Sequence, residues 1–268
     1  MALADTIGRR LSLSLLAVVA GALALTACAA LAVASDRDNL WRVVRACAAD
    51  ARLTGLPFPC LSIDLKDGGE RGHAVLRPPW ANDTILTPTR RVVGLEDPYL
   101  QSPQAPNYFA DAWRSRDMIA TANGRPPTRE QIALIANSRV VRMQDQLHIH
   151  IGCLVPQARR VVAEAAQSLP ADTWRLIGPV VPHQPLFAMR VQSADLDGVD
   201  PFRLAHAAFD GAVRDPADLM IGVVGARVSG QDEFVILASY SHLPHSWWPV
   251  GSDELIDRAC LGEADARR

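Results

Sequence analysis

The stretch Gln146-Leu147-His148-Ile149-His150-Ile151-Gly152-Cys153 alternates between apolar side chains and polar or small ones. Because successive side chains of a strand point to opposite faces, the aliphatic residues share one face while His148 and His150 share the other. We predict a half-buried strand over residues 140–154. Its apolar face would anchor the strand in the core, so that both imidazoles can converge on one ligand.

The rest of the chain mixes helical and strand-like patterns. Thr128 and Gln131 have the spacing of a capping box, which indicates that a helix begins there. Strands separated by helices, with one hairpin, predict an α+β domain over residues 36–268 with a mainly antiparallel sheet. The expected elements are helices over 38–52, 128–136, 157–167, 201–213 and 253–260, strands over 73–77 and 186–192, and a hairpin of 219–228 with 233–240.

The N-terminal segment carries no charge over residues 11–34, a length that can cross a bilayer. Arg9-Arg10 before it and Asp36 after it favour a cytoplasmic N-terminus with the body outside. We therefore predict that residues 1–35 are a transmembrane anchor in the bacterial inner membrane, with the domain facing the periplasm or cell exterior. A cleaved signal peptide, or a lipoprotein signal with Cys28 as the lipidated residue, are alternatives.

The charge pattern argues against nucleic acid as a partner. The formal net charge is −2, and the basic residues are scattered rather than grouped into a stripe. No glycine-rich phosphate loop stands out either. We expect no cofactor and assign no metal ligands.

The cysteines suit an oxidising compartment. Apart from Cys28 there are four, an even number in a body predicted to face the cell exterior. Four cysteines permit three connectivities. The short separation of Cys47 and Cys60 suggests one bridge, which leaves Cys153 and Cys260 for the other. Four reduced, buried thiols are the alternative.

Two histidines that share a strand face are compatible with three kinds of chemistry. A neutral imidazole can attack phosphorus and form a covalent intermediate that water then opens. His148 and His150 can also supply two of three ligands to zinc. The third possibility is that both are satisfied by hydrogen bonds on a polar sheet face.

Several motifs accompany the histidines and narrow this choice. They are Leu86-Thr87-Pro88-Thr89-Arg90, Asn107-Tyr108-Phe109, Asn137-Ser138-Arg139 and Gln144-Asp145-Gln146. With the anchor and the cysteine pairs, they resemble the bacterial CDP-diacylglycerol pyrophosphatases, a branch of the histidine-triad (HIT-like) superfamily. The resemblance is strong over residues 40–155 and weak beyond, except near Cys260. It implies a HIT-like antiparallel sheet flanked by helices, and hydrolysis of CDP-diacylglycerol to CMP and phosphatidate through a histidine nucleophile.

The resemblance leaves the nucleophile open, because a full triad has three alternating histidines and this chain has two. If His148 and His150 fill the first two places, His150 is the nucleophile and Gly152 replaces the third histidine. If Gln146 fills the first place, His148 is the nucleophile. We favour His150 and keep His148 as the alternative.

Other polar residues near the histidines are candidates for substrate binding. Amides can orient imidazoles or bind phosphate, and arginines can offset the charge that builds on phosphoryl oxygens. The candidates are Gln146, Gln144, Asn137, Arg139, Arg142 and Arg90. The expected partners are a nucleotide-linked phospholipid and a bilayer contacted through residues 11–34. Alternative functions are a histidine-triad enzyme of soluble nucleotide conjugates, a metal-dependent phosphodiesterase and a non-catalytic lipid-binding envelope protein.

Overall fold

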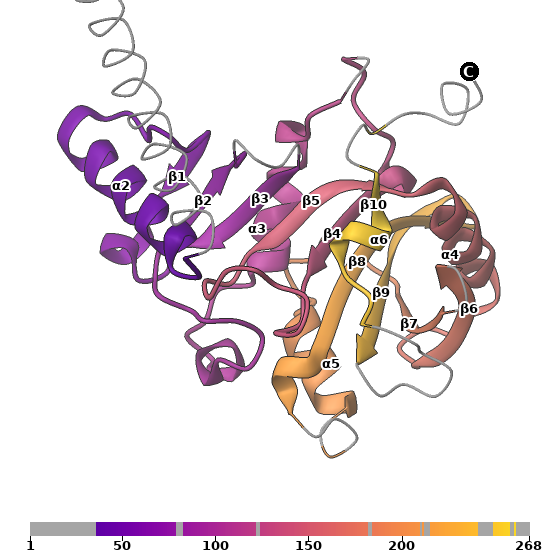
Figure 1. The fold of residues 1–268 in the computed structure, drawn as a ribbon. Helices are drawn as coiled ribbons and strands as arrows, with labels where there is room; N and C mark the ends of the chain where they lie inside the picture. Colours follow the sequence, from indigo (N-terminus) through magenta and orange to yellow (C-terminus); the bar gives the residue numbers. More distant parts are fainter. Residues whose placement is uncertain are drawn as a thin grey trace, which may run out of the picture.

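Ten strands of the described part of the chain form one sheet in the computed structural model (Figure 1). The described residues are 36–78, 83–121, 124–181, 184–209, 211, 215–240, 249–257 and 260. The strands are β1 (Ser62–Asp64), β2 (His73–Leu76), β3 (Thr84–Pro88), β4 (Ile132–Ala136), β5 (Ile149–Leu154), β6 (Arg175–Val181), β7 (Gln184–Val191), β8 (Leu219–Val228), β9 (Gln231–Tyr240) and β10 (Ile256–Asp257). Their order is β1-β2-β3-β5-β4-β8-β9-β7-β6, with β10 paired to β5.

Every pair of neighbouring strands in this order is antiparallel. The helices are α2 (Asn39–Thr54), α3 (Tyr108–Arg114), α4 (Pro156–Ser168), α5 (Pro201–Phe209) and α6 (Ser252–Leu255). The 3-10 turns are η1 (Lys66–Gly69), η2 (Pro98–Gln101), η3 (Arg116–Met118), η4 (Arg129–Gln131) and η5 (Pro216–Asp218). The predicted α+β class with a mainly antiparallel sheet is confirmed.

Helices cover both faces of the sheet. On one face α3 and α5 pack over the central strands, where Phe109 and Phe202 bury their rings near Ile149. On the other face α2 packs at the β1 end of the sheet and α4 packs near β6 (Figure 1). Ile85 and Ile135, which belong to the α2 and α4 clusters, both pair with His150. Since directly paired residues share a face, His150 lies between these two covered regions.

The histidine strand is shorter than predicted. Only its second half, β5, is extended, and the predicted first half over 140–148 is a turn and loop. The backbone N–H groups of Val141 and Arg142 both donate to the carbonyl of Ser138. The Arg142 side chain is buried in ion pairs with Glu96 and Asp145. His148 therefore directly precedes β5 rather than lying in the middle of a strand.

The helix predicted over 128–136 is wrong beyond its first turn. The capping contact exists, because the backbone N–H of Thr128 donates to Oε1 of Gln131 at 2.7 Å, but the turn ends with η4. Residues 132–136, Ile-Ala-Leu-Ile-Ala, are buried throughout and form β4 between β5 and β8. An apolar run of this kind fits a central strand covered on both faces as well as a buried helix.

The predicted hairpin is confirmed as β8 and β9, which pair from Leu219↔Tyr240 to Val228↔Gln231. Its turn uses Ser229 and Gly230 at positive φ, the conformation that a tight antiparallel connection requires.

Two disulfides tie the chain together. Cys47 in α2 is bonded to Cys60 in the loop before β1, and Cys153 in β5 is bonded to Cys260.

The helix predicted over 253–260 is wrong after Leu255. There the chain forms β10 and pairs with the end of β5, an edge that β3 leaves uncovered.

The predicted membrane location is corrected by the described part of the structure. No helix within the described ranges is long and apolar enough to cross a bilayer. The longest of them, α2, has 16 residues, carries several charged side chains and packs against the sheet. This finding contradicts the single-pass location in the inner membrane with the domain facing the periplasm. The predicted anchor over 11–34 and Cys28 lie outside the described residues.

Gly152 provides a test of how β10 packs on β5. A Cβ atom at this position would lie 2.6 Å from Cγ2 of Ile256, which is closer than van der Waals contact permits. We expect Gly152→Ala to lower the free energy of unfolding by about 1–3 kcal/mol, as overpacking of a filled core usually does. Gly198→Ala is the control, because a Cβ there meets nothing within 4 Å. Equal unfolding midpoints for both variants would contradict the close packing of Ile256.

Candidate active site

His148 and His150 face a cavity of about 350 Å³. Their ring centroids are 5.0 Å apart and the rings are inclined by 65°. The cavity is lined by residues from the start of α2, from β3 and β5, and from α6. The described residues that line it are Leu40, Pro78, Asp83, Ile85, Asn137, Val141, Met143, Gln144, His148, His150, Ser252 and Asp253.

His148 is held as a neutral imidazole. Its Nδ1 lies 2.8 Å from the carbonyl oxygen of Gln146, and because a carbonyl only accepts, Nδ1 carries the proton. Burial, and after it the nearby imidazole of His150, lower the pKa of His148 to about 4. The ring therefore keeps an unprotonated Nε2 at neutral pH.

His150 is oriented by a buried carboxylate. Its Nδ1 donates to Oδ2 of Asp83, which is 5% exposed. On the other side, Nδ2 of Asn137 lies 3.3 Å from Nε2 of His150. The amide of Asn137 cannot be reversed freely, because its Oδ1 accepts from the backbone N–H of Ser252 at 2.8 Å. The amide N–H thus points to Nε2, which carries a lone pair, and the proton of the ring is on Nδ1.

The predicted amide residues have different environments. Asn137 contacts His150, as described above. Gln146 is fully buried and its amide bonds the backbone of Pro88, Arg90 and Val92, so it supports the loop before the histidines. Gln144 lines the cavity and accepts from the backbone N–H of Leu40 at the start of α2.

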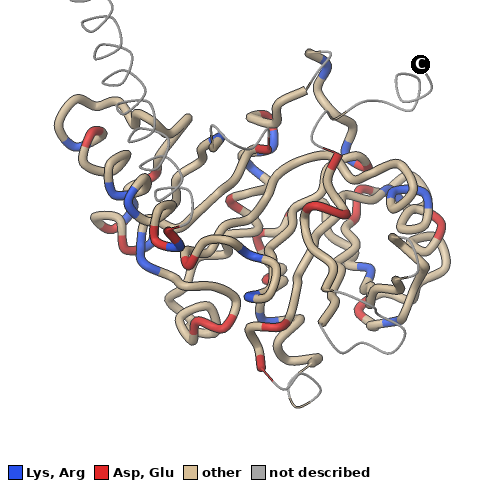
Figure 2. Tube along the Cα trace, viewed as in Figure 1, with Lys and Arg blue, Asp and Glu red and all other residues tan. Residues whose placement is uncertain are grey.

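The predicted arginines do not line the cavity, and none of its described lining residues is arginine or lysine. Arg139 pairs with Asp215, Arg90 pairs with Glu70 and stacks on Tyr99, and Arg142 is buried against Glu96. Figure 2 shows that basic and acidic positions are interspersed along the chain. These arginines are engaged in ion pairs in this structure.

Asp83 and Ser252 are site residues that sequence reasoning missed. Asp83 is 67 positions from His150, and the pair Asn82-Asp83 has only the composition of a turn. Ser252 reaches the site because β10 brings α6 back onto β5. Neither contact has a local sequence pattern.

Two observations bear on the alternative that His148 and His150 bind a metal ion. Among the residues placed by the structure, no group of three His, Cys, Asp or Glu side chains is arranged to hold a metal ion. The Nδ1 of each histidine is already directed at a protein acceptor.

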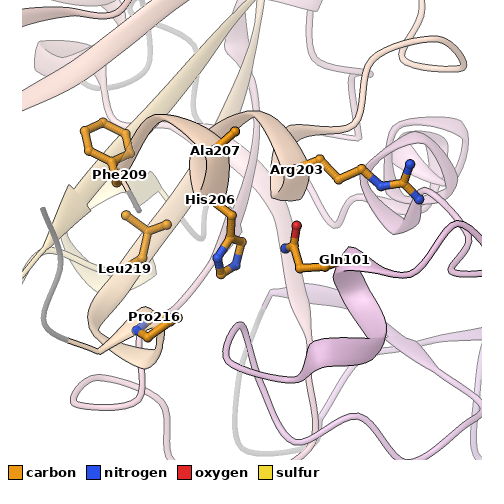
Figure 3. Close-up of a pocket in the computed structure, with 7 residues that line it drawn as sticks. All are labelled: Gln101, Arg203, His206, Ala207, Phe209, Pro216 and Leu219. Atoms are coloured by element: carbon orange, nitrogen blue, oxygen red, sulfur yellow. The ribbon is translucent and has the colours of Figure 1, made fainter. Parts of the chain in front are cut away.

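A second cavity of about 470 Å³ has one histidine, His206, among the described residues that line it (Figure 3). Its ring points into the space between Pro216 and Gln101, and Nε2 donates to the carbonyl of Leu95 at 3.0 Å. Arg203 on the same wall donates to the carbonyl of Ser102. His206 and Arg203 thus serve contacts that join α5 to the chain on both sides of η2, so this cavity is the weaker candidate for chemistry.

The low pKa of His148 predicts how stability depends on pH. The unfolded chain takes up a proton at this residue near pH 6.5, whereas the folded chain does so only near pH 4. The free energy of unfolding should therefore fall as pH drops from 6.5 to 4, by about 3 kcal/mol from this residue at about 1.4 kcal/mol per pH unit. Denaturant unfolding of His148→Gln should show a correspondingly shallower pH dependence. An unchanged slope would contradict the burial of a neutral imidazole.

Comparison with known proteins gives a consistent match. The family described as CDP-diacylglycerol pyrophosphatase matches residues 35–263. A CDP-diacylglycerol pyrophosphatase of Yersinia pestis is 31% identical over 228 residues, covering 84% of this chain and 85% of that protein. A probable CDP-diacylglycerol pyrophosphatase of Mycobacterium leprae (strain TN) is 27% identical over 230 residues, covering 85% and 81%. One from Mycobacterium tuberculosis (strain ATCC 25177 / H37Ra) is 26% identical over 229 residues, covering 84% of each.

Proposed function

The chain belongs to the CDP-diacylglycerol pyrophosphatase family, and from this premise we propose that it hydrolyses CDP-diacylglycerol to CMP and phosphatidate with His148 as the nucleophile. The observation that carries the mechanistic part is the hydrogen bond from Nδ1 of His148 to the carbonyl of Gln146. It fixes the tautomer in which Nε2 is free to attack. We take residues 36–268 as one catalytic domain, because one sheet runs from β1 to β10.

His148 is the better nucleophile of the two histidines. A neutral imidazole attacks through a nitrogen lone pair, and burial keeps His148 neutral at physiological pH. The Nε2 of His150 instead receives the amide N–H of Asn137, and its Nδ1 is bound to a carboxylate. This assignment differs from the preference for His150 that the sequence suggested. It places Gln146, His148 and His150 in the three alternating positions of a HIT-like site.

In the first half-reaction, Nε2 of His148 attacks the cytidylyl phosphorus. A phosphorus–nitrogen bond forms, and the anhydride phosphorus–oxygen bond breaks with its electron pair leaving on phosphatidate. The ring becomes a cytidylylated imidazolium whose Nδ1–H remains bonded to the Gln146 carbonyl. That carbonyl dipole stabilises the positive charge that the ring gains.

In the second half-reaction, His150 acts as general base. Water replaces the Asn137 amide N–H at Nε2 of His150, Nε2 takes a proton from that water, and the water oxygen attacks the cytidylyl phosphorus. The phosphorus–nitrogen bond breaks, its electron pair returns to Nε2 of His148, and CMP is released. Asp83 holds the Nδ1 proton of His150 and stabilises the imidazolium that forms, the role of the carboxylate in a Ser-His-Asp triad.

The reaction can be tested in water enriched with ¹⁸O. Purified protein should release CMP from CDP-diacylglycerol, with the label in the phosphate of CMP and none in phosphatidate. Label in phosphatidate would contradict attack on the cytidylyl phosphorus. No CMP from the lipid, with turnover of water-soluble CDP esters, would instead favour an enzyme of soluble nucleotide conjugates.

A further inference from the structure

Two large apolar side chains are exposed beside the histidine cavity. Met143 is 72% exposed and also lines the cavity, while Val140 in the same turn is 54% exposed. Val141 between them lines the cavity as well. We refer to Val140, Val141 and Met143 as the apolar rim. Scattered exposed apolar residues are ordinary on protein surfaces, so the exposure of the rim does not by itself indicate a ligand.

In the segment that carries the rim, a charged side chain is buried and apolar side chains are exposed, which is the reverse of the usual distribution. Arg142, which lies within it, is buried, and both of its terminal nitrogens bond Glu96 at 2.8 and 2.6 Å. Asp145 bonds Arg142 and also receives two hydrogen bonds from Arg37 at 2.7 Å. Gly94 leaves room for this arrangement, because a Cβ there would lie 2.0 Å from the Arg142 guanidinium. The buried charges hold the segment with its apolar side chains facing outward.

The cavity is lined by both apolar and polar side chains. The apolar ones are Leu40, Pro78, Ile85, Val141 and Met143, and the polar ones include both histidines with Asp83 and Asn137. Such a lining suits a ligand that combines a polar group near the histidines with an apolar group leading out over the exposed Met143. A lipid-linked nucleotide has this division, because its anhydride is polar and its acyl chains are not.

We propose that the apolar rim binds the acyl chains of a lipid-linked nucleotide substrate and makes the site selective for acylated over acyl-free CDP esters. This inference rests on the proposed function for the identity of the polar group. The supporting observation is that Val141 and Met143 line the same cavity as His148, while Met143 is also largely exposed to solvent.

Another exposed apolar group provides a matched control. Leu53, Leu56 and Phe58 are 85%, 65% and 77% exposed, at the far end of α2 from Leu40. Leu53 lies thirteen positions after Leu40 in this helix, about 20 Å along the axis. Leu56→Ser removes an exposed apolar side chain of similar size without touching the cavity wall. Substitutions at such exposed positions usually change stability little.

The test compares CDP-dihexanoylglycerol, kept below its micelle concentration, with acyl-free CDP-glycerol. Dissociation constants are measured by calorimetry in a His148→Ala background, so that binding is read without turnover. With the rim intact, the dihexanoyl ester should bind at least tenfold more tightly than CDP-glycerol. In Val140→Ser/Met143→Ser this preference should fall about tenfold, with CDP-glycerol binding unchanged, and Leu56→Ser should keep it.

Each result has a distinct meaning. Equal binding of the two esters with the rim intact, an undiminished preference in the rim variant, or the same loss in Leu56→Ser would overturn the inference. CMP release by the wild-type protein is measured in parallel. Its absence, with the binding preference present, would reject the proposed hydrolysis while leaving the rim as an acyl-binding surface.

Discussion

Replacing His148 with alanine should lower the kcat of CMP release from CDP-diacylglycerol by about 10⁴-fold or more, the scale seen when a covalent nucleophile is removed. The loss is expected because the Nδ1 proton of His148 is donated to the Gln146 carbonyl, which leaves Nε2 with a lone pair. The corresponding nitrogen of His150 instead receives the amide N–H of Asn137. Initial rates with the purified variant, followed as CMP formed, give the measurement.

His206→Ala is the matched control for this substitution. His206 also donates one ring N–H to a backbone carbonyl, but it lies in the second cavity. It should retain wild-type kcat within about a factor of three, since surface and second-cavity changes alter stability more than chemistry. Activity of His148→Ala within tenfold of the wild type would show that another group attacks phosphorus.

Replacing Asp83 with asparagine should lower steady-state kcat by about 10²–10⁴-fold, the range for loss of effective general acid–base catalysis. Asparagine removes the charge that stabilises the His150 imidazolium, so the step that opens the covalent intermediate should slow most. The first half-reaction does not use His150. Rapid-quench measurements should therefore show a burst of phosphatidate, close to one per active site, before slow release of CMP.

Asp111→Asn is the control for the carboxylate. Asp111 also faces a histidine, His73, with 3.5 Å between Oδ2 and Nδ1, but outside the histidine cavity. Its loss should leave both half-reactions unchanged. Phosphatidate and CMP released together by Asp83→Asn, without a burst, would contradict the separate role assigned to His150 and Asp83.

Periodicity predicted the parts of the fold that local pattern determines. The alternation of Ile149, His150 and Ile151 is correct within β5, where the two isoleucines join the core of one face and His150 lies on the other. It failed over 140–148, because a buried Arg142 paired with Glu96 has no signature in the segment itself. The run Ile132–Ala136 failed for a different reason, since a buried strand and a buried helix share the same apolar composition.

The site was predictable only where its residues are close in sequence. His148, His150, Gln144 and Asn137 lie within one segment and line the cavity together. Asp83 enters through the pairing of β3 with β5, so its role depends on sheet register rather than on a motif. The arginines were chosen for their chemistry alone, and their partners lie on elements whose positions only the fold determines.

Trapping the covalent intermediate can identify which histidine bonds to phosphorus. Wild-type and Asp83→Asn protein are mixed with CDP-diacylglycerol labelled in the cytidine, quenched within milliseconds to seconds, and digested. Fragmentation of the peptide that contains both histidines then locates the adduct. We expect a cytidylyl group on His148, accumulating to nearly one per chain in Asp83→Asn. A cytidylyl group on His150, or no adduct at any time while CMP is formed, would rule out His148 as the nucleophile.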